Sequence, residues 1–478
     1  MNLRIAERHW ETVRRLTSLS FVSGLGFPPE TGCILLLGRN DHPRASTLLV
    51  ADVLVPEHGD FADQESGAIT FSSRYLRKAL IQVRERGLAG FLTAHTHPGS
   101  DRQVGFSPYD DRNDPSLMAN LHDLEPACSF GSMVLGKGSA CARLWQGNIP
   151  SYLHELIIVG EQLMFLNLNG CAESALPAAS DIFDRSLAVT GAGALFRLSK
   201  ARIAIIGLSG TGSLMAELLM RAGAGELVLF EFDPADRTNL GRVLHLRASD
   251  AASRLNKAHR IAQVVAESGL PTKATIVPSG DIRNPEVAAE LLGCDLLVGC
   301  VDRDSPRLIL SEVSYQYLIP LIDLGTEIGA SDAEIQSLDA RVSMVGPGRP
   351  CLLCSRVITQ ERIRLESYVP AEQDRVLAMG YSKDIRLTTP AVMDLNMRAA
   401  SLAGLFIRHL YQPFLKRPLP HSVRETVTNF NPKEQWFQPR EGCVVCNCPE
   451  RLGSGGRFRL STRAATSDPF APSAGASR

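Results

Sequence analysis

Two histidines one residue apart are the first residues of this chain whose type and spacing suit metal chemistry. His95 and His97 end the apolar segment GFLTA, which is predicted to be a strand. Residues i and i+2 of a strand point to the same face, so both imidazoles can reach one metal ion. Asp110 follows beyond a turn-rich stretch, and we expect it to supply an oxygen ligand. Three such ligands leave the fourth tetrahedral position open for water, as in a catalytic zinc site.

Two further residues near this motif could assist hydrolysis. Glu30 lies just before the apolar segment CILLLG, where an unpartnered carboxylate would be costly, and it is a candidate base. The base would take the proton of a water whose pKa zinc lowers to about 7. Ser107 could donate a hydrogen bond to the oxyanion of a hydrolysed amide. Taken singly, these residues also have ordinary interpretations: solvated loop histidines, a surface glutamate, and a serine that caps the helix beginning near Pro108.

A glycine-rich segment, IAIIGLSGTGS, lies where a predicted strand meets a predicted helix. Gly207, Gly210 and Gly212 would let backbone amides and the helix N-terminus approach a phosphate. Glu231 ends the next predicted strand, where a carboxylate can bind ribose hydroxyls. Ser209 stands where the dinucleotide-binding pattern has its middle glycine, so the motif alone indicates a nucleotide and no more.

Polar residues after Glu231 favour a triphosphate over a nicotinamide dinucleotide. Asn239 and Arg242 follow in FEFDPADRTNLGRVL, Lys257 lies in NKAHR, and Asp302 follows the predicted strand DLLVGC. Hydride transfer requires none of these residues, whereas a triphosphate requires cations and a carboxylate that holds magnesium. The expected cofactors of this constellation are therefore ATP and Mg²⁺.

Four of the eleven cysteines form two C-x-x-C pairs that lie far apart in the chain. Cys351 and Cys354 form one pair, and Cys443 and Cys446 form the other. Two matched pairs of this spacing predict a closed, structural four-cysteine zinc site. Apolar surroundings predict that six others are core residues: Cys33, Cys128, Cys141, Cys171, Cys294 and Cys300.

Two folded regions must position these residues. Residues 1–150 combine apolar segments with one amphipathic stretch, SSRYLRKALIQVRERG, which indicates a small mixed α/β domain. Residues 181–450 include a regular alternation of strand-like and helix-like segments, which predicts a doubly wound parallel sheet. We expect a linker over residues 151–180 and a disordered, Gly-, Ser-, Ala- and Pro-rich tail over residues 451–478.

Composition and charge exclude several classes of protein. A net charge of −1 argues against nucleic-acid and anionic-membrane partners, which need a concentrated excess of Lys and Arg. The opening MNLRIAERHWETVRRLTSLS lacks the apolar core of a signal peptide, and no apolar run reaches membrane-spanning length. We therefore expect a soluble, cytoplasmic protein, and 478 residues are enough for two or three domains.

Over residues 20–150 the histidine motif resembles the JAB/MPN-plus (JAMM) metalloproteases, which have a Glu before a strand, then H-x-H-P, then S-x-x-D. The resemblance implies a zinc-dependent hydrolase that cleaves peptide or isopeptide bonds after the C-terminal glycine of ubiquitin-like proteins. Twelve residues separate His97 from Asp110, two more than is usual in that family. We interpret the difference as a longer loop, with Asp110 still the ligand and Asp111 as the alternative.

Residues 180–450 resemble the ThiF-type adenylyltransferases, the superfamily of ubiquitin-activating enzymes and of activators of sulfur-carrier proteins. FDRSLAVTGAGALFRLSKARIAIIG resembles the D-R-Q segment that opens their domain. The resemblance implies that Arg185 reaches the triphosphate of a neighbouring subunit in a homodimer; a surface salt bridge is the alternative. For the other residues it implies ribose binding by Glu231, phosphate binding by Asn239, Arg242 and Lys257, and magnesium binding by Asp302.

Together the two resemblances predict ATP-dependent adenylation of the C-terminal glycine of a ubiquitin-like or sulfur-carrier protein, coupled to zinc-dependent trimming or deconjugation of the same tail. One setting is a bacterial ubiquitin-like modification or defence system with a conjugating enzyme. The alternative is sulfur-carrier activation for cofactor, cysteine or siderophore biosynthesis with a sulfur donor. A non-enzymatic scaffold would have to keep both metal constellations without chemistry.

One feature of many relatives is missing from the chain. No cysteine occurs from Ser355 to Gly442, where these relatives carry a nucleophile that takes the acyl group. We therefore expect the acyl adenylate to pass directly to a partner, with Cys448 as the nearest candidate nucleophile within the chain.

Overall fold

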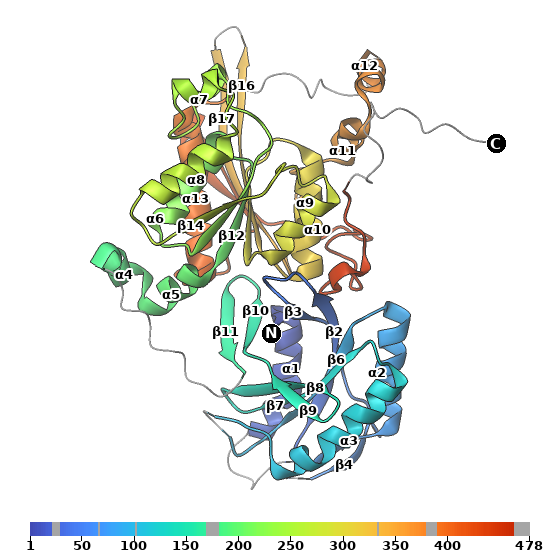
Figure 1. Cartoon of the computed structure of the whole chain (residues 1–478). Coiled ribbons are helices and arrows are strands. Elements are labelled where there is room, and N and C mark those ends of the chain that lie inside the picture. Colours follow the sequence, from blue (N-terminus) through green and yellow to red (C-terminus); the bar gives the residue numbers. More distant parts are fainter. Residues whose placement is uncertain are drawn as a thin grey trace, which may run out of the picture.

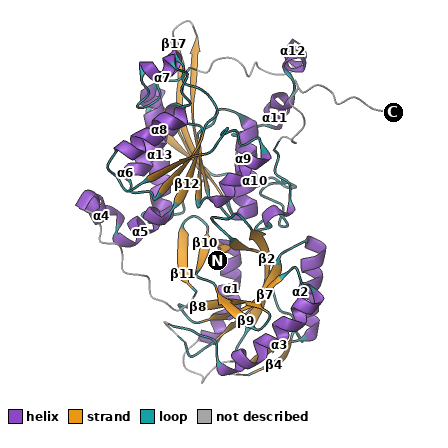
Figure 2. Ribbon diagram, viewed as in Figure 1, coloured by secondary structure: helices purple, strands orange, loops and turns teal. Residues whose placement is uncertain are grey.

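The computed structural model describes residues 1–21, 29–65, 67–100, 103–168, 181–331, 334–378 and 390–462. Two large β-sheets lie one above the other in Figure 1, and Figure 2 shows the same view coloured by secondary structure. We call residues 1–168 the N-terminal domain and residues 181–462 the C-terminal domain. Among the described residues, no helix has both the length and the apolar composition needed to cross a bilayer.

The N-terminal domain is built on a nine-stranded mixed sheet with the order β11-β10-β1-β3-β2-β6-β7-β8-β9. Its strands are β1 (Asn2–Ala6), β2 (Gly32–Asn40), β3 (Thr47–Leu54), β6 (Gly90–Thr96), β7 (Ser129–Leu135), β8 (Ala140–Gln146), β9 (Ile149–Tyr152), β10 (Glu155–Val159) and β11 (Leu163–Asn167). A separate hairpin pairs β4 (Phe61–Gln64) with β5 (Ile69–Phe71), and the helices are α1 (Glu7–Thr17), α2 (Ser73–Arg86) and α3 (Pro108–Leu124).

Alternation along the central strand β2 divides the core of this domain in two. Leu35 and Leu37 belong to an apolar cluster to which α1 contributes Val13. Ile34 and Leu36 belong to a second cluster, which contains residues of α2 and α3. Successive side chains of a strand point to opposite faces, so β2 is covered on both faces and forms the middle of the domain.

The C-terminal domain is built on an eight-stranded sheet with the order β14-β13-β12-β15-β16-β17-β18-β19, in which the first five strands are parallel and the others antiparallel. Its strands are β12 (Arg202–Ile206), β13 (Glu226–Phe230), β14 (Lys273–Ile276), β15 (Leu296–Gly299), β16 (Leu321–Ser331), β17 (Glu334–Val345), β18 (Ser422–Thr426) and β19 (Asn431–Gln435). Its helices are α4 (Asp184–Thr190), α5 (Ala192–Lys200), α6 (Gly210–Arg221), α7 (Ala248–Ala252), α8 (Lys257–Glu267), α9 (Pro285–Ala289), α10 (Asp304–Tyr317), α11 (Gln360–Ser367), α12 (Pro370–Ala378) and α13 (Met393–Tyr411).

The strand order of this sheet reverses between β12 and β15. From β12 the chain moves outward to β14 through α6 and α8, then returns to β15 and continues to β16 through α10. In Figure 1, α6 and α8 lie on one side of the sheet, and α9 and α10 lie on the other. The predicted doubly wound arrangement is confirmed, and in such sheets ligands bind beyond the carboxyl ends of the strands at the point of reversal.

The N-terminal domain packs against the amino ends of these parallel strands. Arg4 Nη2 lies 2.9 Å from Asp295 Oδ1, immediately before β15. Arg44 Nη1 lies 3.5 Å from Glu226 Oε1, at the start of β13. Apolar residues of β1, β3 and β10 belong to the same cluster as the core of the C-terminal sheet. The carboxyl ends of the parallel strands therefore point away from the N-terminal domain.

The histidine motif lies at the opposite end of the N-terminal sheet from this interface. Asn40, the last residue of β2, donates from Nδ2 to the Leu292 carbonyl at 2.8 Å. Gly32, the first residue of β2, pairs with His95. Both sheets therefore separate the two predicted sites, over a distance on the order of 40 Å at a rise of about 3.3 Å per residue.

The predicted start of the linker and the predicted start of the tail both differ from the structure. The N-terminal sheet continues through β10 and β11 to Asn167, because β10 pairs in parallel with β1, so the linker predicted for residues 151–180 begins inside the domain. Residues 169–180 and 463–478 lie outside the described residues.

The tail predicted to be disordered from residue 451 is ordered over residues 451–462. Leu452 is buried, and the Gly453 amide donates to the Tyr315 carbonyl at 3.0 Å. This segment also packs against β2 and β3, since a Cβ on Gly38 of β2 would lie 2.0 Å from the Gly453 carbonyl oxygen and a Cβ on Gly453 would lie 2.6 Å from the Val50 carbonyl oxygen of β3. Its small residues are needed for this close packing between the two domains.

Candidate functional site

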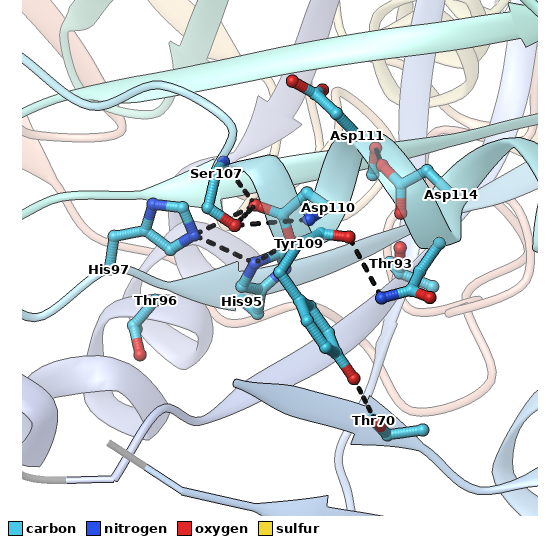
Figure 3. A network of polar contacts seen from close by, with 12 residues as sticks. Thr70, Thr93, His95, Thr96, His97, Ser107, Tyr109, Asp110, Asp111 and Asp114 are labelled. Carbon is cyan, nitrogen blue, oxygen red and sulfur yellow. Dashed lines mark hydrogen bonds and ion pairs between the residues drawn. The ribbon is translucent and has the colours of Figure 1, made fainter. Parts of the chain in front are cut away.

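The side chains of the histidine motif converge on one point at the end of β6 (Figure 3). His95 Nε2 and His97 Nε2 lie 3.2 Å apart. Asp110, from the first turn of α3, places Oδ1 3.2 Å from His95 Nε2 and Oδ2 3.3 Å from His97 Nε2. His95 and Asp110 are buried, and His97 is partly exposed.

These distances suit a tetrahedral zinc ion. With Zn–N and Zn–O bonds of about 2.0–2.2 Å, tetrahedral geometry separates the ligand atoms by about 3.4 Å. The two histidine nitrogens are separated by nearly this distance, and each has a different oxygen of Asp110 at a similar distance. A carboxylate oxygen of Glu30 lies within 4.8 Å of both histidine nitrogens. Two histidines and Asp110 could therefore hold a zinc ion, with the carboxylate of Glu30 as a second acidic group beside them.

Asp110, and not Asp111, faces the histidines because of the way in which α3 begins. Ser107 is the N-cap of α3, and its Oγ accepts a hydrogen bond from the Asp110 amide at 3.2 Å. Asp110 Oδ2 in turn accepts from the Ser107 amide at 2.7 Å and from the Ser107 hydroxyl at 2.8 Å. This reciprocal capping box fixes the carboxylate in the first turn. Ser107 therefore has the capping role that was its alternative interpretation, and it also orients Asp110.

The β4–β5 hairpin holds Glu30 beside the histidines. The Glu30 amide donates to the Glu65 carbonyl at 2.9 Å, and Gln64 Nε2 donates to the Glu30 carbonyl at 2.9 Å. Glu30 is 6% exposed, and burial raises the pKa of its carboxyl group although the nearby histidines oppose the shift. A carboxylate with a raised pKa is a better proton acceptor near neutral pH, as a general base requires.

Asp110 remains ionised in this buried position. Burial alone would raise the pKa of Asp110, but hydrogen bonds from His95, His97 and Ser107 lower it strongly. Burial likewise acts to lower the pKa of His97, but the interaction with Asp110 outweighs burial and the net shift is upward. A deprotonated carboxylate is the form in which Asp binds a metal ion.

Arg143 on β8 forms ion pairs with two aspartates of α3. It was not identified from the sequence. Its Nη1 lies 2.6 Å from Asp111 Oδ1 and its Nη2 lies 2.8 Å from Asp114 Oδ2. Ser132 Oγ donates to the same Asp114 oxygen at 2.5 Å, and the guanidinium lies 3.7 Å from the ring centroid of Phe106. An arginine inside the apolar segment ACARLWQ is the signal that could have revealed it, because buried charges need partners.

The glycine turn after β12 packs closely against neighbouring backbone. Gly207 has a φ of +88°, in the region that favours glycine. A Cβ on Gly212 would lie 1.8 Å from the Gly207 carbonyl oxygen, so α6 begins directly against the turn. A Cβ on Gly207 would lie 2.8 Å from the Cys300 carbonyl oxygen, which follows β15. The turn thus presents the N-terminus of α6 at the carboxyl edge of the sheet, as phosphate binding requires.

Glu231 and Lys257 meet beside this turn. Glu231 Oε2 accepts from the Leu208 amide at 2.9 Å, and Oε1 accepts from the Asp233 amide at 2.9 Å. Lys257 Nζ lies 3.2 Å from Glu231 Oε2, and both side chains are buried. A carboxylate offers about four acceptor sites, so three donors leave Glu231 with one for a ribose hydroxyl.

Asn239 and Arg242 lie on the segment that follows β13. Asn239 is buried, and its Oδ1 accepts from the Asp236 amide at 3.2 Å. The Arg242 carbonyl oxygen lies 3.5 Å from the position that a Cβ on Gly210 would take. The side chain of Arg242 is only partly buried, and Nη1 donates to the Thr238 carbonyl at 3.2 Å. The segment therefore borders the glycine turn and could hold phosphate groups.

Asp302 and Arg185 are exposed. Asp302 lies in the loop that leads from β15 to α10, two residues beyond the Cys300 carbonyl that contacts the glycine turn. Its carboxylate could hold a magnesium ion at this edge. Arg185 lies on α4, close in sequence to Phe183, whose ring contacts Gly223 beyond the C-terminal end of α6, the opposite end from the glycine turn. Arg185 forms no ion pair with any described residue. The fold of one chain therefore does not bring Arg185 to the other residues.

The two cysteine pairs come together as predicted. Sγ atoms of Cys351 and Cys443 lie 3.7 Å apart, and those of Cys354 and Cys446 lie 3.4 Å apart. A tetrahedral zinc ion with Zn–S bonds of about 2.3 Å separates its sulfur ligands by about 3.8 Å, so the cluster could hold zinc. The Arg440 amide donates to Cys354 Sγ at 3.2 Å, and a hydrogen bond from Cys446 lowers the pKa of Cys351 to about 6.

Replacing Arg143 tests whether its ion pairs position the ligand helix. We expect Arg143→Met to destabilise the N-terminal domain by about 3–5 kcal/mol, because Asp114 is left buried without a cation. Hydrogen exchange of the α3 amides measures this change. Asp111→Asn, which alters only the exposed side of the network, should cost less than about 1 kcal/mol. Equal effects of the two substitutions would contradict the anchoring role.

Comparisons with known proteins find relatives of part of the chain. The chain is 28% identical over 160 residues to tRNA threonylcarbamoyladenosine dehydratase of Escherichia coli (strain K12), covering 33% of this chain and 58% of that protein. It is 24% identical over 168 residues to ubiquitin-like modifier-activating enzyme 5 of Dictyostelium discoideum, covering 32% of this chain and 40% of that protein. The chain thus spans about half the length of the curated relatives it matches.

Solved structures include a crystal structure of E. coli MccB with ATP, to which the chain is 18% identical with a TM-score of 0.44, covering 57% of this chain and 77% of that one. The model of the ThiF family matches residues 183–449. This match spans the glycine turn, Glu231, Lys257, Asp302 and both cysteine pairs, and it covers more than half of the chain, which therefore belongs to the ThiF family.

Proposed function

We propose that the C-terminal domain adenylates a carboxylate at the end of a protein or peptide partner. The observation that carries this proposal is the gathering of the glycine turn, Glu231, Lys257 and Arg242 at the carboxyl edge of the parallel sheet. Membership of the ThiF family supports it, as does the likeness to a relative named for activating a ubiquitin-like modifier.

The reaction needs ATP because a free carboxylate is a poor electrophile. A carboxylate oxygen attacks the α-phosphorus of ATP, the bond from this phosphorus to the bridging oxygen breaks, and pyrophosphate leaves. Arg242 and Lys257 would stabilise the charge on the departing pyrophosphate. Glu231 would bind the ribose and Asn239 a phosphate. Asp302 would hold Mg²⁺, which neutralises phosphate charge when it is bound.

The proposed partner is a ubiquitin-like or sulfur-carrier protein that ends in glycine. Conjugation through a conjugating enzyme and sulfur transfer from a sulfur donor both begin with the same acyl adenylate, so the site favours neither. Arg185 is exposed on α4, near the end of α6 opposite the glycine turn of its own chain, which supports a homodimer in which it reaches the triphosphate of the neighbouring subunit. Cys448 is partly buried beside the cysteine cluster and is the candidate acyl acceptor within the chain.

The N-terminal domain is proposed to be a zinc hydrolase of the JAMM type that acts on the same kind of tail. The convergence of His95, His97 and Asp110 within about 3.3 Å of one another favours this second function. Zinc bound there would lower the pKa of a water to about 7. Glu30 would accept the proton. Ser107 would donate to the oxyanion after its hydroxyl turns away from Asp110 Oδ2, to which it donates in this structure.

The two activities would act on a tail in separate encounters. The amino ends of the parallel strands face the N-terminal domain, whereas the glycine turn lies at their carboxyl ends. A separation on the order of 40 Å is too great for one short tail to reach both sites of one chain. Hydrolysis would expose the glycine carboxylate, and the trimmed protein would leave before it is adenylated.

Two substitutions in the C-terminal domain test the adenylation. Asp302→Ala and Arg242→Ala should each lower the ATP–pyrophosphate exchange that depends on a ubiquitin-like protein ending in glycine, by about 10²- to 10³-fold, because each removes a group that stabilises phosphate charge. Arg221→Ala, at the exposed end of α6, is the matched control and should keep full exchange. A wild-type protein that binds NAD tightly and ignores ATP would refute the assignment.

The distances at His95 and Asp110 also suit hydrogen bonds without a metal ion. Metal analysis therefore tests the proposed zinc site directly. Purified protein should contain two zinc ions per chain, since the residues of both clusters lie close enough to share one ion. His95→Ala should remove one ion and Cys351→Ser the other. Glu30→Ala should abolish peptide cleavage with the metal content unchanged. Well-folded protein with a single zinc ion per chain would contradict the assignment of two zinc sites.

A mixture of a hydrolase variant and an adenylation variant tests whether trimming and adenylation occur in separate binding events. Glu30→Ala protein and Asp302→Ala protein, each at the wild-type concentration, should together adenylate an extended precursor about as fast as the wild type, because the trimmed carrier diffuses between them. Adenylation of the precursor is followed as pyrophosphate release. A mixture that is many-fold slower would mean direct transfer within one assembly.

A further inference from the structure

Asn396 is a buried side chain whose amide nitrogen has no hydrogen-bond partner within the described part of the chain. It lies on α13 and is 2% exposed. Its Oδ1 accepts a hydrogen bond from Thr326 Oγ1 on β16 at 3.3 Å, whereas Nδ2 is buried without a hydrogen-bond partner among the described residues. Most buried polar groups of folded proteins are paired, so an unpaired amide needs an explanation.

The unpaired nitrogen faces the glycine turn. A Cβ on Gly210 would lie 2.2 Å from Asn396 Nδ2, so the amide lies directly against the first residue of α6. Gly210 opens a helix of twelve residues whose first backbone amides have no partner within the helix. The donor of Asn396 therefore joins the donors with which the helix N-terminus attracts anions.

The position of Thr326 places the pair at the same edge of the sheet. β15 and β16 are parallel, and their pairing ends at Gly299 and Asp323. Thr326 lies three residues further along β16, beyond the paired segment and toward the carboxyl edge. Asn396 thus bridges α13, β16 and the turn over which the proposed nucleotide would lie.

We propose that Asn396 is a further binding residue of the adenylation site, whose Nδ2 donates to an anionic oxygen held over the glycine turn. This inference rests on the proposed adenylation. The oxygen belongs either to a phosphate of the nucleotide or to the carboxylate that is to be adenylated, and the two sources share the chemistry of an anion accepting from an amide. Because Nδ2 is buried in the ligand-free chain, this contact requires the Asn396 amide to rotate toward the ligand as it binds.

Two substitutions of Asn396 separate binding from a structural role. Asn396→Leu removes an unpaired donor, so the melting temperature of the ligand-free protein should stay the same or rise. Asn396→Asp keeps the shape and the acceptor for Thr326 but turns the donor into an anion. We expect kcat/KM of pyrophosphate exchange to fall about 10-fold in the Leu variant and about 100-fold in the Asp variant. Ser401→Ala, exposed on the same helix, is the control and should keep wild-type exchange and stability.

The source of the oxygen follows from two binding measurements on the Asp variant. Weaker ATP binding without a carrier protein identifies a phosphate, whereas unchanged ATP binding with a raised KM for the carrier identifies the carboxylate. Wild-type exchange in the Asp variant, or a lower melting temperature with normal exchange in the Leu variant, would overturn the proposal. A wild-type protein that shows no exchange would instead refute the adenylation itself, which keeps the two failures distinct.

Discussion

The direction of the parallel strands relative to the domain interface determines where this molecule can bind ligands. Asp295, at the amino end of β15, pairs with Arg4 of the N-terminal domain and also accepts from the Arg202 amide at 2.9 Å. Arg4 is 4% exposed, and a buried charge of this kind is tolerated only when it is paired. Because this interface covers the amino ends, the carboxyl ends of the parallel strands are left open at the opposite edge. The glycine turn and Glu231 lie at that open edge.

Buried charges organise both candidate sites in the same way. Asp110 is compensated by two histidines, and Glu231 by Lys257 and two backbone amides. Each cluster is held by residues outside it: Arg143 fixes α3, and the close packing of Gly207 and Gly212 fixes α6. The polar groups are therefore oriented before a ligand arrives, and binding needs little reorganisation.

Local patterns in the sequence predicted most of what lies within a single element. The alternation of strand-like and helix-like segments indicated the doubly wound sheet, and Ser107 was identified as a possible cap of the helix that begins near Pro108, as the structure shows. The C-x-x-C pairs predicted a cluster across 92 residues, because four ligands of one metal ion constrain each other. These predictions succeeded where the signal is carried by spacing along the chain.

Contacts between distant elements were not predictable in this way. The pairing of β10 with β1 extends the N-terminal domain past its predicted end. The sequence of β10 alone does not indicate which strand it pairs with. Residues 451–462 have the composition of a disordered tail, yet Gly453 is needed for close packing against β3. In the sequence, Asn396 cannot be told apart from other polar residues of a helix. Only the fold places its side chain against Gly210. Each depends on tertiary packing, which composition and periodicity do not encode.

The most direct test of the account follows one oxygen atom. A ubiquitin-like protein whose C-terminal carboxylate carries oxygen-18 is incubated with the enzyme and ATP, and hydroxylamine then cleaves the acyl adenylate at its acyl carbon. The bridging oxygen stays with phosphorus, so mass spectrometry should find one oxygen-18 atom in the released AMP. Unlabelled AMP, with all of the label left in the carrier protein, would show that water and not the carboxylate attacks ATP, and would contradict the central claim that this chain activates a carboxylate.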